Sequence, residues 1–135
     1  MRKLLLVCAG GAIGSGLRHL VGLGAAALHG PGLPAGTFLV NVLGSFLIAV
    51  VMRLALGGRL PDAARLFLAT GVMGGFTTFS AFSVETLRFL AAGTPGAAAA
   101  YLAATVLACL SAGLAGEALV RRSLRLRTAG DEPGA

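Results

Sequence analysis

Charged residues are scarce in this chain: they make up 12% of its 135 residues, whereas soluble proteins carry roughly 25%. Tryptophan is absent, and only two histidines, two cysteines and five acidic residues are present. These few groups show neither metal-ligand spacing nor the Ser, His and Asp pattern of a hydrolase. We therefore expect an integral membrane protein that is not an enzyme and has no separate soluble domain.

Apolar residues dominate instead, at 56% of the chain with a mean hydropathy of +0.88. A membrane-spanning helix needs about 20 apolar residues, so the length accommodates four spans with short connections. The sequence predicts an all-α membrane protein whose transmembrane helices cover residues 4–28, 36–56, 64–92 and 97–120. Residues 1–128 then form a single four-span transmembrane domain, and residues 129–135 form a disordered polar tail.

The basic residues give a formal charge of +6, which in a soluble chain would suggest a nucleic-acid partner. Here they crowd the ends of the spans, as expected for topological reasons, and no aromatic residues alternate with them for base stacking. We expect a multi-pass protein in the lipid bilayer of the cell (plasma) membrane, with no nucleic acid as a partner. Most basic residues fall on the side of the two termini, which predicts cytoplasmic termini: Arg2, Lys3, Arg53, Arg59, Arg65, Arg121, Arg122, Arg125 and Arg127.

The third span is interrupted by residues 71–83, Gly-Val-Met-Gly-Gly-Phe-Thr-Thr-Phe-Ser-Ala-Phe-Ser. An unpaired backbone amide or carbonyl costs several kcal/mol in hydrocarbon, so irregular backbone survives there only inside protein or along a cavity. We predict a helix that is broken at residues 73–80, with half-helices at residues 64–72 and 81–90. Broken helices at membrane depth are typical of ion and substrate sites.

Aromatic and hydroxyl side chains are interleaved in this motif. Phe79 and Phe82 are three residues apart, so a helix places them on one face. The electropositive edges of their rings, together with the neighbouring hydroxyls, suit a small anion. Asn41, within the second span, is compatible either with an interhelical hydrogen bond or with an amide donor that faces a pore. Glu85 and Arg88, at i and i+3, are predicted to pair with each other, with direct contact to the ion as the alternative.

The first span carries Gly10 and Gly14 in a GxxxG pattern, which favours close packing of helix backbones in a membrane. Arg18, in the C-terminal half of this span, is expensive in hydrocarbon and should face protein, water or lipid headgroups. Cys8 and Cys109 both fall in apolar spans and are expected to be buried small apolar residues.

Three segments of the chain resemble the Fluc (CrcB) fluoride channels, and the resemblance extends over nearly the whole chain. They are residues 10–18 (GGAIGSGLR), residues 36–46 (GTFLVNVLGSF), and residues 71–82 followed by Ser83 and Glu85. The third segment is the most specific of the three. Two departures from the family pattern are Phe76, where an aliphatic residue is common, and Ala81, where Thr or Ser is common.

The resemblance implies an antiparallel dimer of four-helix subunits, with two fluoride pathways along the interface. It also implies a structural sodium ion at the centre that is not transported. Gly74 and Thr77 match the positions whose backbone carbonyls hold the sodium, and Arg18 matches a basic residue near the pathway entrance. The residues assigned to the fluoride pathway are Asn41, Thr78, Phe79, Ser80, Phe82, Ser83, Tyr101, Thr105 and Ser111.

The implied function is a fluoride-selective ion channel that passively exports cytoplasmic fluoride and so reduces its toxicity. One alternative is a small four-span proton-coupled drug exporter, which would want a membrane-embedded acid in the first span; that span has none. A non-conducting membrane assembly subunit would leave the third-span motif unexplained. The dimer partner is either a second copy or an oppositely oriented paralogue, and the uneven basic residues favour the paralogue.

Overall fold

The computed structural model describes residues 1–30, 32 and 34–130, and these residues contain helices but no strand. Four helical stretches are long and apolar enough to cross a membrane, by length and composition. The prediction of an all-α, four-span protein is therefore confirmed. In chain order the elements are α1 (Arg2–His29), α2 (Ala35–Leu56), α3 (Asp62–Arg65), η1 (Leu66–Met73), α4 (Gly74–Phe76), α5 (Phe79–Ala91) and α6 (Pro95–Gly130).

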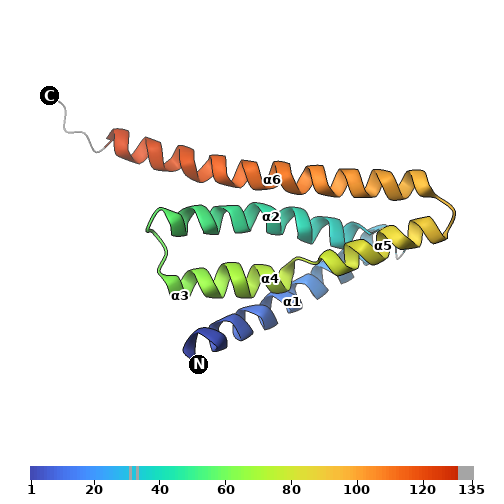
Figure 1. Ribbon diagram of the computed structural model, residues 1–135, viewed down its shortest axis with the longest axis horizontal. Helices are drawn as coiled ribbons and strands as arrows, with labels where there is room; N and C mark the ends of the chain where they lie inside the picture. The colour runs from blue at the N-terminus through green and yellow to red at the C-terminus, as the bar shows by residue number, and fades with distance from the viewer. Residues whose placement is uncertain (31, 33, 131–135) are drawn as a thin grey trace.

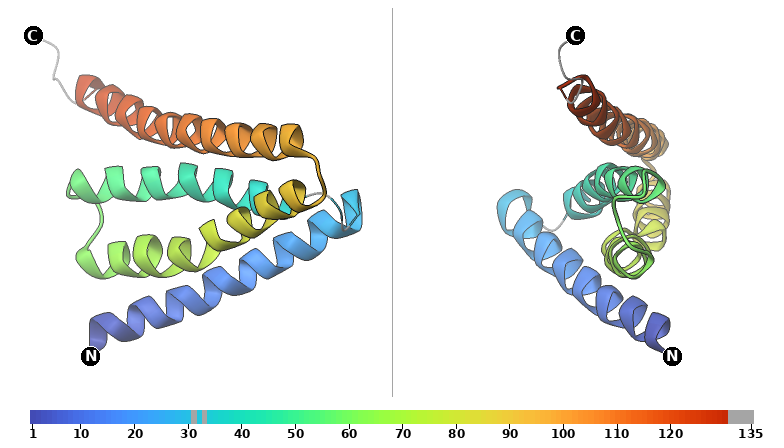
Figure 2. Two further views of the ribbon diagram at one scale, coloured as in Figure 1. Left: turned by 45° about the vertical axis from the view of Figure 1, so that its right-hand side comes forward. Right: turned by 90° about the vertical axis from the view of Figure 1, so that its left-hand side faces the viewer.

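The four spans run up and down beside one another. The start of α1, the end of α6 and the α2–α3 connection lie at one end of the molecule, whereas the α1–α2 and α5–α6 connections lie at the other end (Figure 1). Helix α6 packs along α2, and α1 packs along η1 and α4 (Figure 2). The third span, built from α3, η1, α4 and α5, contacts α1 and α2, and its α5 half also contacts α6.

Helix α1 approaches the third span so closely that only glycine fits at the contact. A Cβ atom at Gly10 would lie 2.5 Å from the Phe67 carbonyl oxygen, and one at Gly14 would overlap the Val72 carbonyl oxygen. In the opposite direction, a Cβ at Gly75 would overlap the Gly11 carbonyl oxygen. The predicted GxxxG packing face is therefore confirmed, and it holds the first half of the third span against α1.

The third span is broken where it was predicted to be, although over a shorter stretch. Only Thr77 and Thr78 leave the helical conformation, whereas the prediction was residues 73–80. The helix continues to Phe76 because that ring is buried in a core cluster with Val40, Val72 and Met73. A π-helix, the register that is frequent at functional sites, occupies Leu66–Met73 directly before the break.

Helix α6 is the longest element and extends beyond the predicted span of residues 97–120 to Gly130. It therefore includes residues 129 and 130, the first two residues of the predicted tail. Residues 131–135 of that tail lie outside the described residues.

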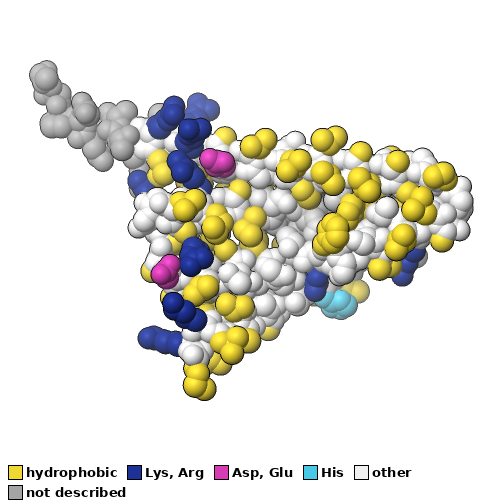
Figure 3. Space-filling view, in the orientation of Figure 1, with side chains coloured by type: hydrophobic (Ala, Val, Ile, Leu, Met, Phe, Trp, Pro, Cys, Tyr) yellow, Lys and Arg dark blue, Asp and Glu magenta, His cyan; other side chains and the backbone are white. Residues whose placement is uncertain are grey.

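The outer faces of the helices carry exposed apolar side chains, including Leu107, Leu110 and Leu114 on α6. Figure 3 shows hydrophobic side chains spread along the length of the spans, with Lys and Arg gathered at the end that holds the start of α1 and the end of α6. Contiguous exposed apolar surface of this kind indicates contact with lipid or with a partner subunit. The charged end marks the level at which the protein leaves the hydrocarbon.

Candidate functional site

The peptide at the helix break is held by the side chain of Asn41 on α2. Asn41 Nδ2 donates to the Thr78 carbonyl over 2.9 Å, and the Thr78 amide donates to Asn41 Oδ1 over 2.8 Å. One amide side chain thus satisfies both backbone groups of Thr78, as a neighbouring strand would do. Without this pair, the broken backbone would bury unsatisfied polar groups at about 1–3 kcal/mol each.

The break frees two carbonyl groups of the third span. In an uninterrupted helix, the Thr78 and Ala81 amides would donate to the Gly74 and Thr77 carbonyls. Here the Thr78 amide donates to Asn41, and the Ala81 amide donates to Thr78 Oγ1 over 3.2 Å. The Gly74 and Thr77 carbonyls therefore lose their helical donors, and carbonyl oxygen is the ligand type that hard cations prefer.

Arg18 of α1 reaches one of these carbonyls, since its Nη1 donates to Thr77 O over 3.3 Å. The guanidinium is half-buried and satisfies the expectation that this charge faces protein or water. A carbonyl oxygen has two lone pairs, so this contact leaves one of them for a further ligand. The Gly74 and Thr77 oxygens are thus of the ligand type that a structural cation takes, whereas the Arg18 charge beside Thr77 O opposes a second cation at that oxygen.

Helix α5 begins beside the break with its amide end exposed to the site. Thr78 is the N-cap residue, and its hydroxyl accepts from the Ala81 amide and lies 3.1 Å from Ser80 Oγ. Helix N-termini carry partial positive charge, which attracts anions. Carbonyl oxygens of the kind that bind cations thus lie before the break, and a helix N-terminus of the kind that attracts anions lies after it.

A groove of about 370 Å³ runs over the break between α2, α5 and α6. Phe79 and Phe82 line it with their ring centroids 5.7 Å apart and tilted by 49°. Phe79 is 78% exposed and Phe82 is 7% exposed, so one ring stands at the surface of the subunit and the other is inside it. The groove is lined by Asn41, Gly44, Ser45, Ile48, Thr77, Thr78, Phe79, Phe82, Thr105, Val106, Cys109 and Leu110.

Two hydroxyl groups of this groove differ in how they are satisfied. Ser45 Oγ donates to the backbone carbonyl of Asn41 over 2.7 Å. Thr105 is only 4% exposed, and its Oγ1 is buried without a hydrogen-bond partner among the described residues. Buried hydroxyls are normally paired, and this one lies close enough to Tyr101 to act on the Tyr101 hydroxyl, so a ligand in the groove would compete with Tyr101 for it.

Glu85 connects three spans rather than pairing with Arg88. Its Oε1 accepts from the Thr37 hydroxyl and its Oε2 accepts from the Tyr101 hydroxyl, each over 2.7 Å. The predicted Glu85–Arg88 pair is therefore wrong. The reason is that α2 and α6 each bring a hydroxyl donor to the carboxylate, which no i, i+3 rule on a single helix can reveal.

The Tyr101 ring extends the aromatic row that begins at the break. Its centroid lies 5.4 Å from that of Phe82 and 5.8 Å from that of Phe89. The hydroxyl of the same residue reaches Glu85. Tyr101 thus joins the groove at Phe82 to the carboxylate at Glu85.

A second groove, of about 680 Å³, lies between α1, α2 and α5 and shares Thr78 with the first. Arg18 and His19 contribute basic groups to it, and Ser15, Thr37 and Ser80 contribute hydroxyls. This basic, hydroxyl-lined hollow next to the break suits a hydrated anion.

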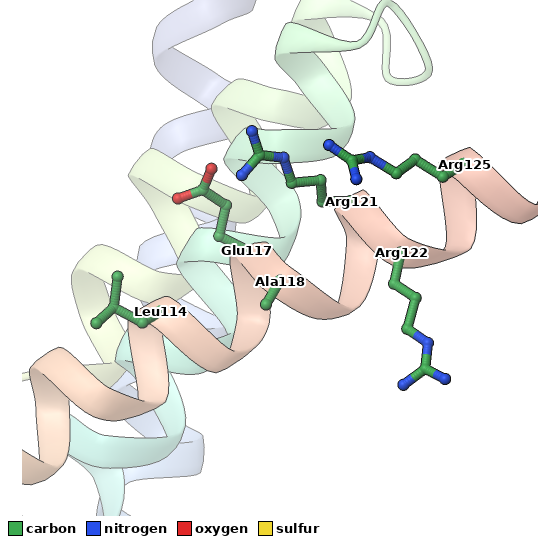
Figure 4. A pocket seen from close by; sticks show the side chains of 6 residues that line it. All are labelled: Leu114, Glu117, Ala118, Arg121, Arg122 and Arg125. Atoms are coloured by element: carbon green, nitrogen blue, oxygen red, sulfur yellow. The ribbon is translucent and has the colours of Figure 1, made fainter.

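A third hollow, of about 440 Å³, lies on α6 at the end that holds the termini. Figure 4 shows Glu117 and Arg121 extending to the same side of α6, with Arg125 one turn beyond Arg121 and Arg122 pointing to the opposite side. These are the interfacial charges of the last span, and the hollow contains none of the residues assigned to the pathway.

The structure brings most of the predicted site residues together. Asn41, Thr78, Phe79, Phe82 and Thr105 line the first groove, and Ser80 and Arg18 line the second. Two further predicted residues contact the first set, because Ser83 Oγ donates to Phe79 O and Tyr101 packs on Phe82.

In the fourth span the predicted residues do not all lie in the grooves of the subunit. Ser111 is exposed and lies outside both grooves, whereas Cys109, which was expected to be a buried apolar residue, is half-buried and lines the first groove. Cys8 is exposed rather than buried. The missed signal is spacing: Tyr101, Thr105 and Cys109 are four residues apart and share one helix face, which Ser111 does not. Thr37 in the second groove, its hydrogen-bond partner Glu85, and Ser45 in the first groove were not among the predicted residues.

Taken together, the fold and the site define a multi-pass membrane protein with a broken helix and an anion-type groove beside it. The chain matches the model of the family described as "CrcB-like protein, Camphor Resistance (CrcB)" over residues 5–117. It belongs to the CrcB family.

Relatives within this family share much of the sequence. A protein of Anaeromyxobacter dehalogenans named fluoride-specific ion channel FluC is 56% identical over 122 residues, which cover 90% of this chain and 97% of the relative. The protein of the same name from Caulobacter vibrioides is 47% identical over 124 residues, covering 90% and 98%. That of Thermus thermophilus is 52% identical over 101 residues, covering 75% and 81%. These matches do not support the alternative of a proton-coupled drug exporter.

Proposed function

We propose that this chain forms a fluoride-selective channel that passively exports cytoplasmic fluoride. Membership of the CrcB family and the names of the relatives support this function. The observation that carries it is the groove in which Phe79, Phe82, Asn41 and Thr105 meet beside the N-terminus of α5. Fluoride is the small, strongly hydrated anion for which such a groove would supply replacement donors.

The donors in the groove are of the type that replaces water around an anion. The Asn41 amide carries two N–H groups, and one of them is used on the Thr78 carbonyl. Because the amide is planar and held at two points, the other N–H is fixed in direction away from the Thr78 peptide. That N–H, the Thr105 hydroxyl and the ring edges of Phe79 and Phe82 are donors without a full positive charge, so an anion can bind and still leave.

The test of this pathway is the replacement of each ring by an aliphatic side chain. We expect Phe79→Ile and Phe82→Ile to reduce fluoride flux in liposomes by about tenfold or more. This reduction corresponds to an increase of roughly 1.4 kcal/mol in the barrier to conduction. Phe46→Ile is the matched control, because Phe46 lines an apolar hollow elsewhere. Fluoride flux equal to that of the unmodified protein in both groove variants would remove these rings from the pathway.

The subunit supports a proposal for an antiparallel dimer with a structural sodium ion. The Gly74 and Thr77 carbonyls supply two oxygens per subunit, fewer than a hard cation takes, so a partner that contributes the same pair would double the number of protein ligands. When bound, the ion would neutralise the carbonyl dipoles that the break exposes. Phe79, at 78% exposure, would be covered by the same partner.

The orientation proposal is that both termini face the cytoplasm. Basic residues at that end of the molecule include Arg2, Lys3, Arg59, Arg121 and Arg122, and Lys and Arg near span ends favour the cytoplasmic side. A second copy in the opposite orientation would place all of these charges outside. We therefore propose an oppositely biased paralogue as the partner, with the homodimer as the alternative.

A further inference from the structure

Cys109 places a reactive thiol group on the wall of the groove. It is a free thiol on α6, half-buried, and it lines the same groove as Asn41, Phe79 and Phe82. It lies one helical turn from Thr105 on the same face of α6. The free thiol therefore lies along the route assigned above to the anion.

A second observation concerns a buried hydroxyl on the same wall of the groove. The Thr105 hydroxyl is buried, the residue being 4% exposed, and it makes no hydrogen bond of standard geometry among the described residues, although it lies close enough to act on the Tyr101 hydroxyl. A buried hydroxyl with no partner costs about 1–3 kcal/mol, a cost that a polar ligand or water in the groove would remove. Water at Thr105 would also reach the neighbouring Cys109 thiol.

We propose that Cys109 is a thiol-modification site inside the groove for small disulfides and thiosulfonates, and that its adduct blocks ion flux. The proposal rests on the proposed function, because the block is defined against fluoride conduction. A methylthio group adds two heavy atoms to a groove of about 370 Å³ beside Phe79 and Phe82. It fills the space through which the anion would pass.

The chemistry is ordinary thiol–disulfide exchange. The Cys109 thiol loses its proton to water, and the thiolate attacks the sulfenyl sulfur of methyl methanethiosulfonate. A new S–S bond forms, and methanesulfinate leaves with the electron pair of the broken bond. Dithiothreitol reverses the adduct by taking the methylthio group as a mixed disulfide and then closing to its own cyclic disulfide, with release of methanethiol. The thiolate is the reacting species in such exchange, so reaction at Cys109 requires that both water and the reagent enter the groove.

The experiment uses two full-length variants that each retain one cysteine. Cys8→Ser leaves Cys109 alone, and Cys109→Ser leaves Cys8, which is exposed on α1 away from the groove. Both are reconstituted in liposomes and treated with methyl methanethiosulfonate, and both fluoride efflux and protein mass are measured. We expect Cys8→Ser to gain one methylthio group. Its fluoride flux should fall by about tenfold or more, which corresponds to an increase of ~1.4 kcal/mol in the barrier. Dithiothreitol should restore the flux of Cys8→Ser, and the reagent should leave the flux of Cys109→Ser unchanged.

The outcomes separate this proposal from the proposed function. Suppose that Cys8→Ser conducts fluoride before treatment. If it then gains no adduct at Cys109 after treatment, or conducts equally with the adduct in place, the proposed modification site is wrong. If neither variant conducts fluoride before treatment, the channel function fails. In that case the mass measurement on Cys8→Ser still decides whether the Cys109 thiol is accessible.

Discussion

At the scale of single residues, Asn41 has two roles that no other side chain near the break combines. Its amide pairs with both backbone groups of Thr78, and it still has one N–H for a ligand. Holding the break and, in the proposed pathway, contacting the anion are thus joined in one side chain. A change there affects both the backbone geometry and the donor set of the groove.

We predict that Asn41→Asp reduces fluoride flux by about tenfold or more, because losing a donor to a charged ligand costs roughly 1.5–3 kcal/mol. The carboxylate keeps the acceptor for the Thr78 amide, but it faces the Thr78 carbonyl without a hydrogen to donate. Ser45→Ala is the matched control in the same groove, since it loses only a bond to the Asn41 backbone. Flux would be measured in liposomes after both variants are shown to be folded dimers. Equal flux in the two variants would contradict the role given to the Asn41 side chain.

The sequence predicted the residues of the break better than those that surround it. Phe79 and Phe82 could be predicted because their spacing and their hydroxyl neighbours lie in one local segment. Glu85 could not be paired correctly, because its partners Thr37 and Tyr101 come from two other helices. The rotation of a lipid-facing helix about its axis is weakly encoded in an almost uniformly apolar span, which is why the sequence did not predict that Cys109 lines the groove and that Ser111 is exposed.

At the scale of secondary-structure elements, the break is shorter than its polar sequence suggested. The motif contains enough glycine and hydroxyl residues to predict irregular backbone over residues 73–80. Burial of Phe76 against Val40 and capping of α5 by Thr78 restrict it to two residues. The existence of the spans follows from hydropathy and length, whereas the extent of the break depends on packing from α2.

We predict that the cation at this break is held by backbone carbonyls rather than by the Thr77 hydroxyl. That hydroxyl already donates to the Met73 carbonyl over 3.0 Å, so Thr77→Ser keeps both the carbonyl and this bond. Thr77→Ser should retain flux within about twofold, a change of ~0.4 kcal/mol. Exchange of sodium for N-methylglucamine should lower flux in the variant and in the unmodified protein alike. Full flux after exhaustive removal of sodium would count against a structural cation.

At the scale of the whole molecule, charge is distributed unevenly between the two ends. Lys and Arg gather at the end that holds the start of α1 and the end of α6 (Figure 3). One orientation therefore obeys the positive-inside tendency and the reverse orientation opposes it. An antiparallel pair of identical chains would contain one copy of each kind.

We predict that the chain inserts with its termini in the cytoplasm. In a background with Cys8→Ser and Cys109→Ser, Lys3→Cys and Gly130→Cys should be protected from an impermeant thiol reagent in intact cells. Ala92→Cys, at the opposite end between α5 and α6, is the control and should be labelled. Equal labelling of all three positions would instead restore a homodimer that inserts both ways.

The central claim is that the groove conducts fluoride, and ion efflux from liposomes holding only this purified chain tests it most directly. Reconstitution from detergent inserts subunits in both directions, so an antiparallel pair can form from one chain. With liposomes loaded with equal fluoride and chloride, the account predicts fluoride efflux far above that of protein-free liposomes and almost complete retention of chloride. Absence of fluoride efflux from protein verified to be dimeric, or equal efflux of both anions, would contradict it.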